Sequence, residues 1–221
     1  MTGVQTCALP IFETWTNFVN QRKAWGYRQD QLPTTHPIVA DMVDLDAVEV
    51  NFDGITYAKG ASALKQLVAW VGEESFFNAI RSYFKKHAWR NTELADLMAE
   101  LEAASGRDLD NWSQRWLQTA GVNTLRPEIV VADGVIQSFN VLQDPPSSPP
   151  GVDQMLRPHR IRIGLFRHEQ RSLARFDHVD IDIDGPLTPV PELVGKPMPD
   201  MVLVNDDDLT FAKIRLDPQS S

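Results

Sequence analysis

Residues 109–141 read LDNWSQRWLQTAGVNTLRPEIVVADGVIQSFNV, and the spacing of the apolar residues changes within this stretch. In its first part the apolar side chains recur at helical spacing, with Trp112 and Trp116 on one face. In its second part they alternate with polar residues as in a strand, and Asp133-Gly134 is typical of a two-residue hairpin turn. The sequence therefore predicts a helical first half and a second half built of strands.

Amphipathic helices are also predicted before residue 109. Apolar residues recur at helical spacing in four segments, at 12–27, 57–72, 76–84 and 91–106. Asn91 and Thr92 are favoured N-cap residues, so we expect the last of these helices to begin there. Residues 28–56 show little regular period, and a connection of that length is unusual in a compact domain and often functional.

The chain after residue 141 continues the strand pattern. A loop rich in proline and serine at 144–151 is followed by four short segments of alternating polarity, at 159–165, 178–183, 201–204 and 210–216. Such strands favour a small antiparallel β-sandwich. The expected fold class is α+β, with a helical lobe at 12–123, a sandwich at 124–217 and a tail at 218–221.

The composition narrows the classes of function. The chain has 221 residues and a net charge of −9, with a pI near 5.0. It has no basic stripe, so we expect no nucleic-acid partner. It also has no apolar run of the roughly 20 residues that cross a bilayer, so we expect no membrane partner. Since the first residues lack the pattern of a secretory signal, we expect a cytoplasmic protein.

The single cysteine, Cys7, excludes an intramolecular disulfide framework and a thiolate metal cluster. It lies in the opening segment MTGVQTCALPI (1–11), which resembles a translated sequencing adapter and shows neither a helical nor a strand period. We therefore expect residues 1–11 to be foreign to the fold, and the natural polypeptide to begin upstream.

The common catalytic motifs are absent from the sequence. A zinc peptidase helix carries His-Glu-x-x-His, whereas HEQRS at 168–172 has serine at the second histidine position and lies among strands. His159, His168 and His178 are too far apart to form a local ligand set, so we expect them at the surface. A Gly-rich phosphate loop and a Gly-x-Ser-x-Gly elbow are missing too. Judged from the residues alone, the chain has no complete catalytic constellation.

One stretch is more specific. FDGITYAKGASAL at 52–64 resembles the Tyr-x-Lys-Gly segment of the M1 family of zinc aminopeptidases. THPI at 35–38, WSQRWLQTAG at 112–121 and LVNDDDLTFAK at 203–213 are similar to further segments of that family, and they occur in the same order. The resemblance covers nearly everything from residue 12 to residue 217.

The resemblance implies a fold and an activity. It assigns the helical half to the last part of a thermolysin-like catalytic domain and the second half to the β-sandwich domain of a longer enzyme. That enzyme would hydrolyse N-terminal residues from peptide substrates with one zinc ion. The zinc ligands and the segment that binds the substrate's free amine have no match here, so we expect this chain alone to bind no zinc and to be inactive.

The resemblance assigns one catalytic residue to this sequence, Tyr57. A phenol has an ordinary pKa of about 10, so at pH 7 its O–H can donate a hydrogen bond to the oxygen that becomes negative in the tetrahedral intermediate. From spacing alone Tyr57 would be a half-buried aromatic at a helix start. The matching run around it favours the catalytic role.

Other polar residues have simpler interpretations. We expect His36 to be a loop histidine bonded to the backbone, Lys59 to reach solvent or a carboxylate, and the three aspartates at 206–208 to form a solvated turn rather than a calcium loop. We expect Trp112 and Trp116 to be core residues.

A second hypothesis belongs to a different class of function. The chain could be a non-catalytic binding module made of a helical lobe and a β-sandwich, which the missing zinc ligands favour. If the chain is instead part of a longer enzyme, its helical lobe should expose an apolar surface and self-associate.

Overall fold

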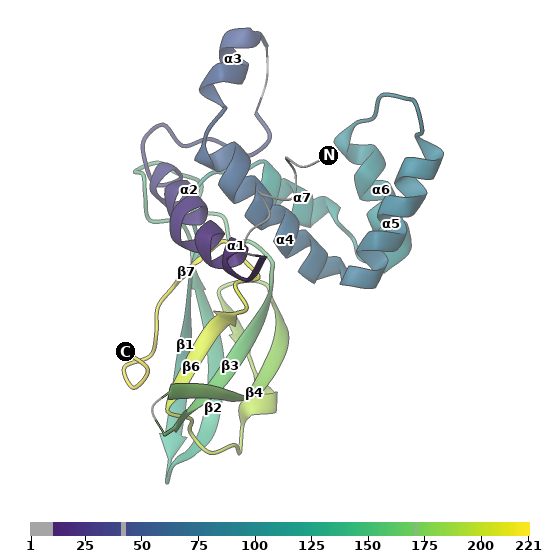
Figure 1. Ribbon diagram of the computed structural model, residues 1–221. Coiled ribbons are helices and arrows are strands. Elements are labelled where there is room, and N and C mark those ends of the chain that lie inside the picture. The colour runs from purple at the N-terminus through teal and green to yellow at the C-terminus, as the bar shows by residue number, and fades with distance from the viewer. Residues whose placement is uncertain (1–10, 41–42, 171) are drawn as a thin grey trace.

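The computed structural model describes residues 11–40, 43–170 and 172–221, so the adapter-like residues 1–10 lie outside the described part. All described helices of the first half precede residue 118, and all strands follow residue 123. Figure 1 shows the helices as one lobe and the strands as a sandwich beneath it. The expected α+β class is confirmed.

Seven α-helices and two π-helical turns form the helical lobe in the described part of the chain. They are α1 (Ile11–Asn17), η2 (Phe18–Lys23), α2 (Ala24–Gln29), α3 (Leu45–Val50), η3 (Ile55–Lys59), α4 (Gly60–Val71), α5 (Glu73–Lys86), α6 (Leu94–Ser105) and α7 (Asp110–Leu117). None of these helices is both long and apolar enough to cross a lipid bilayer.

Two local expectations for the helices were wrong. The irregular stretch contains α3, which begins where the Asp44 carboxylate accepts a hydrogen bond from the Ala47 amide. Helix α6 begins later than expected, because Glu93 and Asp96 form a reciprocal capping box that satisfies the first amides. A capping box is a stronger start signal than the N-cap residue types before it.

The core of the lobe forms around the two tryptophans of α7. Trp112 and Trp116 are almost fully buried, as expected. They pack with Leu67 of α4 and Leu101 of α6. Phe211, which follows the last long strand of the sandwich, belongs to the same cluster and stacks on Tyr27 with ring centroids 4.2 Å apart. The helical core is thus completed by a residue from the far end of the chain.

The sandwich has two sheets in the described residues. Their strands are β1 (Thr124–Ala132), β2 (Val135–Asp144), β3 (His159–Glu169), β4 (Ser172–Ile183), β5 (Leu187–Pro189), β6 (Met201–Asp206) and β7 (Lys213–Ile214). The strand orders are β5-β2-β1-β7 and β4-β3-β6. The inward residues alternate along each strand, as with Ile161, Ile163 and Leu165, and form the core between the sheets.

The strand predictions were confirmed in the hairpin and wrong at the sheet edges. Asp133 and Gly134 both have positive φ and join β1 to β2. Strand β7 is only two residues long and pairs with β1 in parallel, so the first sheet is mixed rather than antiparallel. The short strand β5 was not predicted, because three residues carry too little alternation to be recognised.

Buried hydrogen bonds join the lobe to the sandwich. Gln66 of α4 is fully buried, and its amide nitrogen donates to the carbonyls of Arg160 and Leu209. Its amide oxygen accepts from the Arg160 amide at 2.6 Å. Tyr27 donates to the Ala212 carbonyl, and the Trp116 indole donates to the Pro158 carbonyl. The two units therefore share directional contacts as well as apolar surface.

We expect Gln66→Ala to lower the free energy of unfolding by at least about 2 kcal/mol, because it leaves buried backbone groups of β3 unpaired. Urea unfolding followed by circular dichroism measures this change. The matched control is Gln137→Ala on the exposed face of β2, which should stay within about 0.5 kcal/mol of the unmodified chain. Equal stability of the two variants would contradict the role given to Gln66.

Candidate functional site

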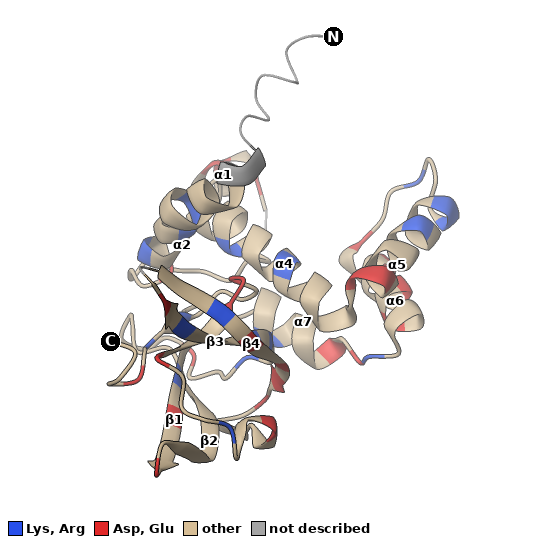
Figure 2. Cartoon of the chain, turned by 60° about the horizontal axis from the view of Figure 1, so that its bottom comes forward, with Lys and Arg blue, Asp and Glu red and all other residues tan. Residues whose placement is uncertain are grey.

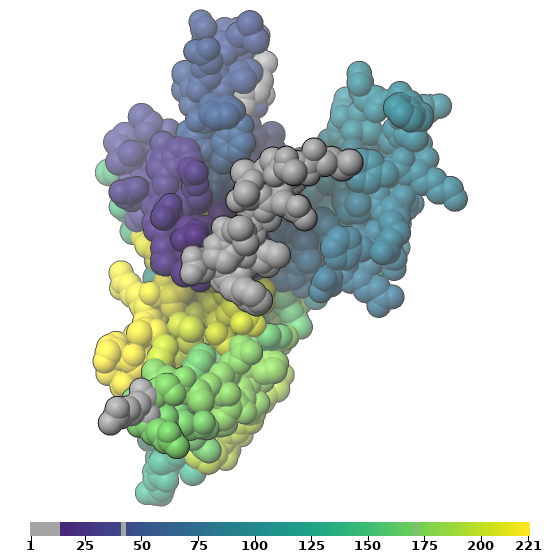
Figure 3. Space-filling view, in the orientation of Figure 1, coloured from purple at the N-terminus to yellow at the C-terminus, as the bar shows by residue number. Residues whose placement is uncertain are grey.

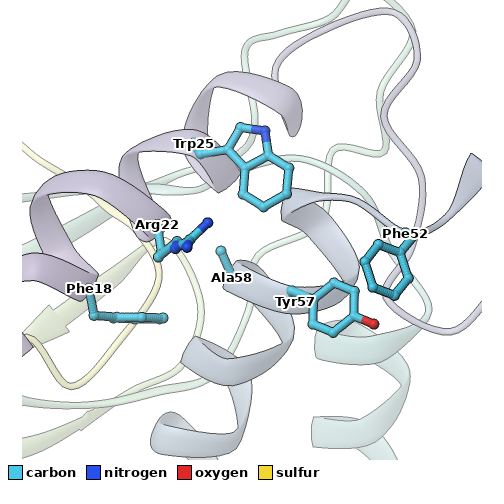
Figure 4. A pocket seen from close by; sticks show the side chains of 6 residues that line it. All are labelled: Phe18, Arg22, Trp25, Phe52, Tyr57 and Ala58. Atoms are coloured by element: carbon cyan, nitrogen blue, oxygen red, sulfur yellow. The ribbon is translucent and has the colours of Figure 1, made fainter. Parts of the chain in front are cut away.

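Tyr57 lies in the π-helical turn η3, which runs directly into α4. Its side chain is 50% exposed and contacts Phe52 with ring centroids 4.6 Å apart. It borders an open cavity of about 300 Å³ whose other walls include Phe18, Trp25 and Ala58. Figure 4 shows the phenol beside Phe52, with Trp25 across the cavity. No described residue hydrogen-bonds the Tyr57 hydroxyl, which is open to a ligand.

The start of this turn is held by hydrogen bonds to Asp53. One carboxylate oxygen, Oδ1, accepts from the amides of Ile55 and Thr56, both at 2.9 Å. The other oxygen lies 3.0 Å from Nε2 of His36, whose Nδ1 bonds the Pro37 carbonyl. The backbone bond expected for His36 is therefore confirmed, and its second nitrogen supports the turn that carries Tyr57.

Helix α2 packs closely against the same turn. The Gln29 amide oxygen accepts a hydrogen bond from the Gly54 amide. A Cβ atom on Gly26 would lie 3.1 Å from the Gly54 carbonyl oxygen and 3.2 Å from Cβ of Ala58. Because the two backbones touch, the position of the turn is tied to that of α2.

Lys59 ends the turn in a buried ion pair. Its Nζ lies 2.9 Å from Oδ2 of Asp30, and both side chains are fully buried. Nζ also donates long hydrogen bonds to the carbonyls of Thr119 and Gly121, each at 3.4 Å. Of the two expected partners of Lys59, solvent or a carboxylate, the structure shows the carboxylate, and it lies inside the protein.

Asp30 links further segments to this ion pair. Its Oδ1 accepts from the Gly121 amide at 2.9 Å and from the Thr35 hydroxyl at 2.7 Å. Gly121 has φ of +87°, and a Cβ there would lie 2.7 Å from Pro146. Only glycine fits this close, left-handed position.

Arg157 is a second buried cation near the ion pair. Its guanidinium donates to the carbonyls of Arg115, Thr119 and Ala120 and to the Asn123 side chain. These carbonyls belong to the last turn of α7 and the residues after it, where the helix dipole favours positive charge. Asp30, Lys59 and Arg157 therefore form a buried charge cluster with two cations and one carboxylate.

The charge cluster changes the pKa of Lys59. Burial and, to a smaller extent, the nearby Arg157 lower that pKa, the carboxylate of Asp30 raises it, and the net result is a pKa of about 8. Burial also lowers the pKa of Arg157 to about 10. One carboxylate cannot fully compensate two desolvated cations, so the more readily deprotonated lysine gives up its proton first.

His159 is fully buried, so its expected surface position was wrong. Its Nδ1 lies 2.7 Å from the Thr210 hydroxyl and its Nε2 lies 3.0 Å from the Gln143 amide oxygen. Burial, together with nearby Arg157, lowers the pKa of His159 to about 3. The ring is neutral at pH 7 and lies at the junction between the two units, with its centroid 5.3 Å from that of the Trp116 ring. His168 and His178 are exposed, as expected.

The acidic turn at 206–208 makes ion pairs. Asp206 and Asp207 pair with Arg175, and Asp208 pairs with the buried Lys23 at 2.5 Å. Across β3 and β4, Arg162 pairs with Asp180. Figure 2 shows basic and acidic residues together on this part of the sandwich. The turn is thus occupied by protein cations rather than merely solvated.

The described residues do not fit a zinc centre. In the part of the chain that the structure describes, no three His, Cys, Asp or Glu side chains are close enough together to hold a metal ion. His36 and Asp53 form only a pair beside the Tyr57 turn. The zinc ion that the sequence resemblance implies has no binding site among these residues.

Comparison with known proteins found a matching family and similar relatives. The model of the peptidase family M1 domain matches residues 3–116, which include the turn that carries Tyr57. Aminopeptidase N of Streptomyces lividans is 60% identical over 211 residues, which are 94% of this chain and 25% of that protein. Aminopeptidase M1-B of Oryza sativa is 32% identical over 79% of this chain and 20% of its own length. The chain thus spans a quarter or less of the length of these relatives.

We expect the Lys59 ammonium to titrate near pH 8, well below the ordinary lysine value of 10.5, because burial and Arg157 oppose its charge. NMR of the chain with 13C-labelled lysine side chains measures the midpoint from the Cε shift. Asp30→Asn should lower this midpoint further, since it removes the opposing carboxylate. A lysine set that titrates entirely near 10.5 would contradict the burial of this charge.

Proposed function

The chain belongs to peptidase family M1, and from that premise we propose that it forms part of an aminopeptidase that hydrolyses N-terminal residues from peptides. Tyr57 would stabilise the tetrahedral intermediate of this reaction. The observation that carries the proposal is the half-exposed phenol on the cavity wall, whose hydroxyl has no hydrogen-bond partner among the described residues. The cytoplasmic location stays a prediction.

The chemistry of a phenol suits this role. When a nucleophile attacks the scissile carbonyl, negative charge develops on the carbonyl oxygen, and a rigidly held O–H can donate a hydrogen bond to it. Loss of one such donor typically raises the barrier by roughly 2.7–4 kcal/mol. The turn that carries Tyr57 is fixed at both ends, by Asp53 and by Lys59, so the donor needs little reorganisation.

In this proposal the zinc ion typical of the family is bound by residues other than those described. When bound, it would supply an activated water and polarise the carbonyl. The described residues contribute the hydrogen-bond donor and its support. The absence of a three-ligand group among them also favours the second hypothesis, a binding module without catalysis. The two hypotheses differ in whether the Tyr57 hydroxyl affects turnover.

The exposed apolar side chains of the lobe support contact with further polypeptide. Val43, Leu45 and Val50 are each more than 75% exposed, and Phe52 is 68% exposed. Figure 3 shows that α3, which carries part of this segment, projects from the lobe. A surface of this kind is typical of an interface. We infer that it packs on other parts of the enzyme, and that it promotes self-association of the chain on its own.

The role of Tyr57 can be tested in a hybrid enzyme, in which the 211 matched residues of this chain replace their counterparts in Streptomyces lividans aminopeptidase N. We expect Tyr57→Phe to lower kcat by on the order of 10²–10³ with little change in KM, because the hydrogen bond forms in the transition state. Hydrolysis of a chromogenic aminoacyl amide measures both constants.

Tyr83→Phe is the matched control, since Tyr83 lies on α5, its hydroxyl bonds the Thr92 hydroxyl in the connection to α6, and it does not line the cavity. It should leave kcat unchanged. Wild-type turnover by the Tyr57→Phe hybrid would remove the residue from the mechanism and favour the binding module.

We expect the 221-residue chain alone neither to bind stoichiometric zinc nor to cleave an aminoacyl amide, because its described residues lack a metal-binding group. Metal analysis after dialysis against zinc and an activity assay at high protein concentration measure these properties. One zinc per chain together with turnover would show that the ligand set had been missed.

A further inference from the structure

We propose that Lys59, through its buried ion pair with Asp30, is a positioning residue that sets the direction of the Tyr57 hydroxyl. This inference rests on the proposed function of Tyr57. It assigns a role to two charges that lie inside the protein and that the reaction itself does not use.

Tyr57 and Lys59 lie in the same short turn. They are two residues apart in η3, and side chains at this spacing point to different sides of a helical turn. Accordingly Tyr57 is 50% exposed on the cavity, whereas Lys59 is fully buried. Any group that fixes the Lys59 ammonium therefore also fixes how far the turn is rotated about its axis, and hence where Tyr57 points.

Three oxygen atoms surround the ammonium, one at 2.9 Å and two at 3.4 Å. Asp30, at the end of α2, lies 2.9 Å from Nζ, and the carbonyls of Thr119 and Gly121 approach it from the connection after α7. Asp30 is itself held by the Gly121 amide and the Thr35 hydroxyl. Two separate segments of the chain thus meet at the lysine and hold the turn between them.

The phenol has little other support. Its ring contacts Phe52, which is itself 68% exposed, and its hydroxyl has no partner among the described residues. The direction of the hydroxyl is therefore set by the backbone of the turn. Asp53 holds the start of that turn and Lys59 holds its end.

A charge at this position is better explained by positioning than by stability. A buried ion pair often contributes no more to stability than apolar residues of similar volume, because both charges lose their hydration. An ammonium does, however, make directional contacts with several oxygens at once, which an apolar side chain cannot do. The ion pair between Lys59 and Asp30 therefore holds the turn in one conformation, although both charges lose their hydration.

The test uses the hybrid enzyme and a double-mutant cycle. We expect Lys59→Met to lower kcat about ten- to a hundred-fold with little change in KM, since a donor displaced by about 1 Å loses much of its effect. In the Tyr57→Phe background the same substitution should lower kcat no further, because the misplaced hydroxyl is already absent. Lys65→Met on α4, which removes a partly exposed lysine, should leave kcat unchanged.

A second variant distinguishes a loss of positioning from a loss of folding. Asp30→Asn with Lys59→Met removes both charges of the ion pair, so no unpaired carboxylate stays buried, and Arg157 keeps its hydrogen bonds to the carbonyls of Arg115, Thr119 and Ala120. It should remain folded, with a cooperative melting transition, and should still lose kcat. An equal loss from Lys59→Met in both tyrosine backgrounds, or no loss in the unmodified one, would overturn the positioning role.

The 221-residue chain gives an independent readout. It contains three tyrosines, so 19F NMR with 3-fluorotyrosine resolves Tyr57 after assignment with single Tyr→Phe variants. We expect the Tyr57 signal to shift and broaden in Lys59→Met and in the double variant, but not in Lys65→Met. An unchanged signal would overturn the inference. If Tyr57→Phe leaves turnover intact, the proposed function fails, while this signal still tests the link between Lys59 and Tyr57.

Discussion

Two cations and one carboxylate are buried together where α2, the Tyr57 turn and the end of α7 meet. Asp30 and Lys59 are fully buried, and Arg157 is 1% exposed. Such a cluster is tolerable only because carbonyl groups replace the lost water. The carbonyls come from the end of α7 and the connection to β1, so the cluster can form only when α2, the Tyr57 turn and that connection have come together.

At their junction, the helical lobe and the sandwich also depend on each other. Phe211 completes the core of the lobe, Gln66 pairs with the backbone of β3, and Lys23 reaches the acidic turn after β6. His159 is neutral and buried between Thr210 and Gln143. Since Gln66 both donates hydrogen bonds to the sandwich and accepts one from it, the sandwich holds α4 in position. The turn with Tyr57 is the start of that helix.

The sequence predicted those features that depend on local pattern. The change of period, the Asp133-Gly134 hairpin and the buried tryptophans of α7 follow from neighbouring residues and were confirmed. The charge cluster could not be predicted in this way. Asp30 and Lys59 are separated by 29 positions that show no regular period, and Arg157 follows a proline-rich loop, so nothing local indicates that they meet. The same holds for the parallel pairing of β7, which depends on contacts 89 residues apart.

The two sides of the Tyr57 turn are therefore different physical environments, and this difference bears on function. Its inner side is dry, charged and fully occupied, so it resists rotation. Its outer side carries Tyr57, which lines an open cavity together with Phe52. A hydrogen-bond donor contributes most to a reaction when its support is rigid and its own polar atom is free. In the role that we propose for it, Tyr57 meets both conditions. A tyrosine that only filled the core would need a rigid support but no free hydroxyl.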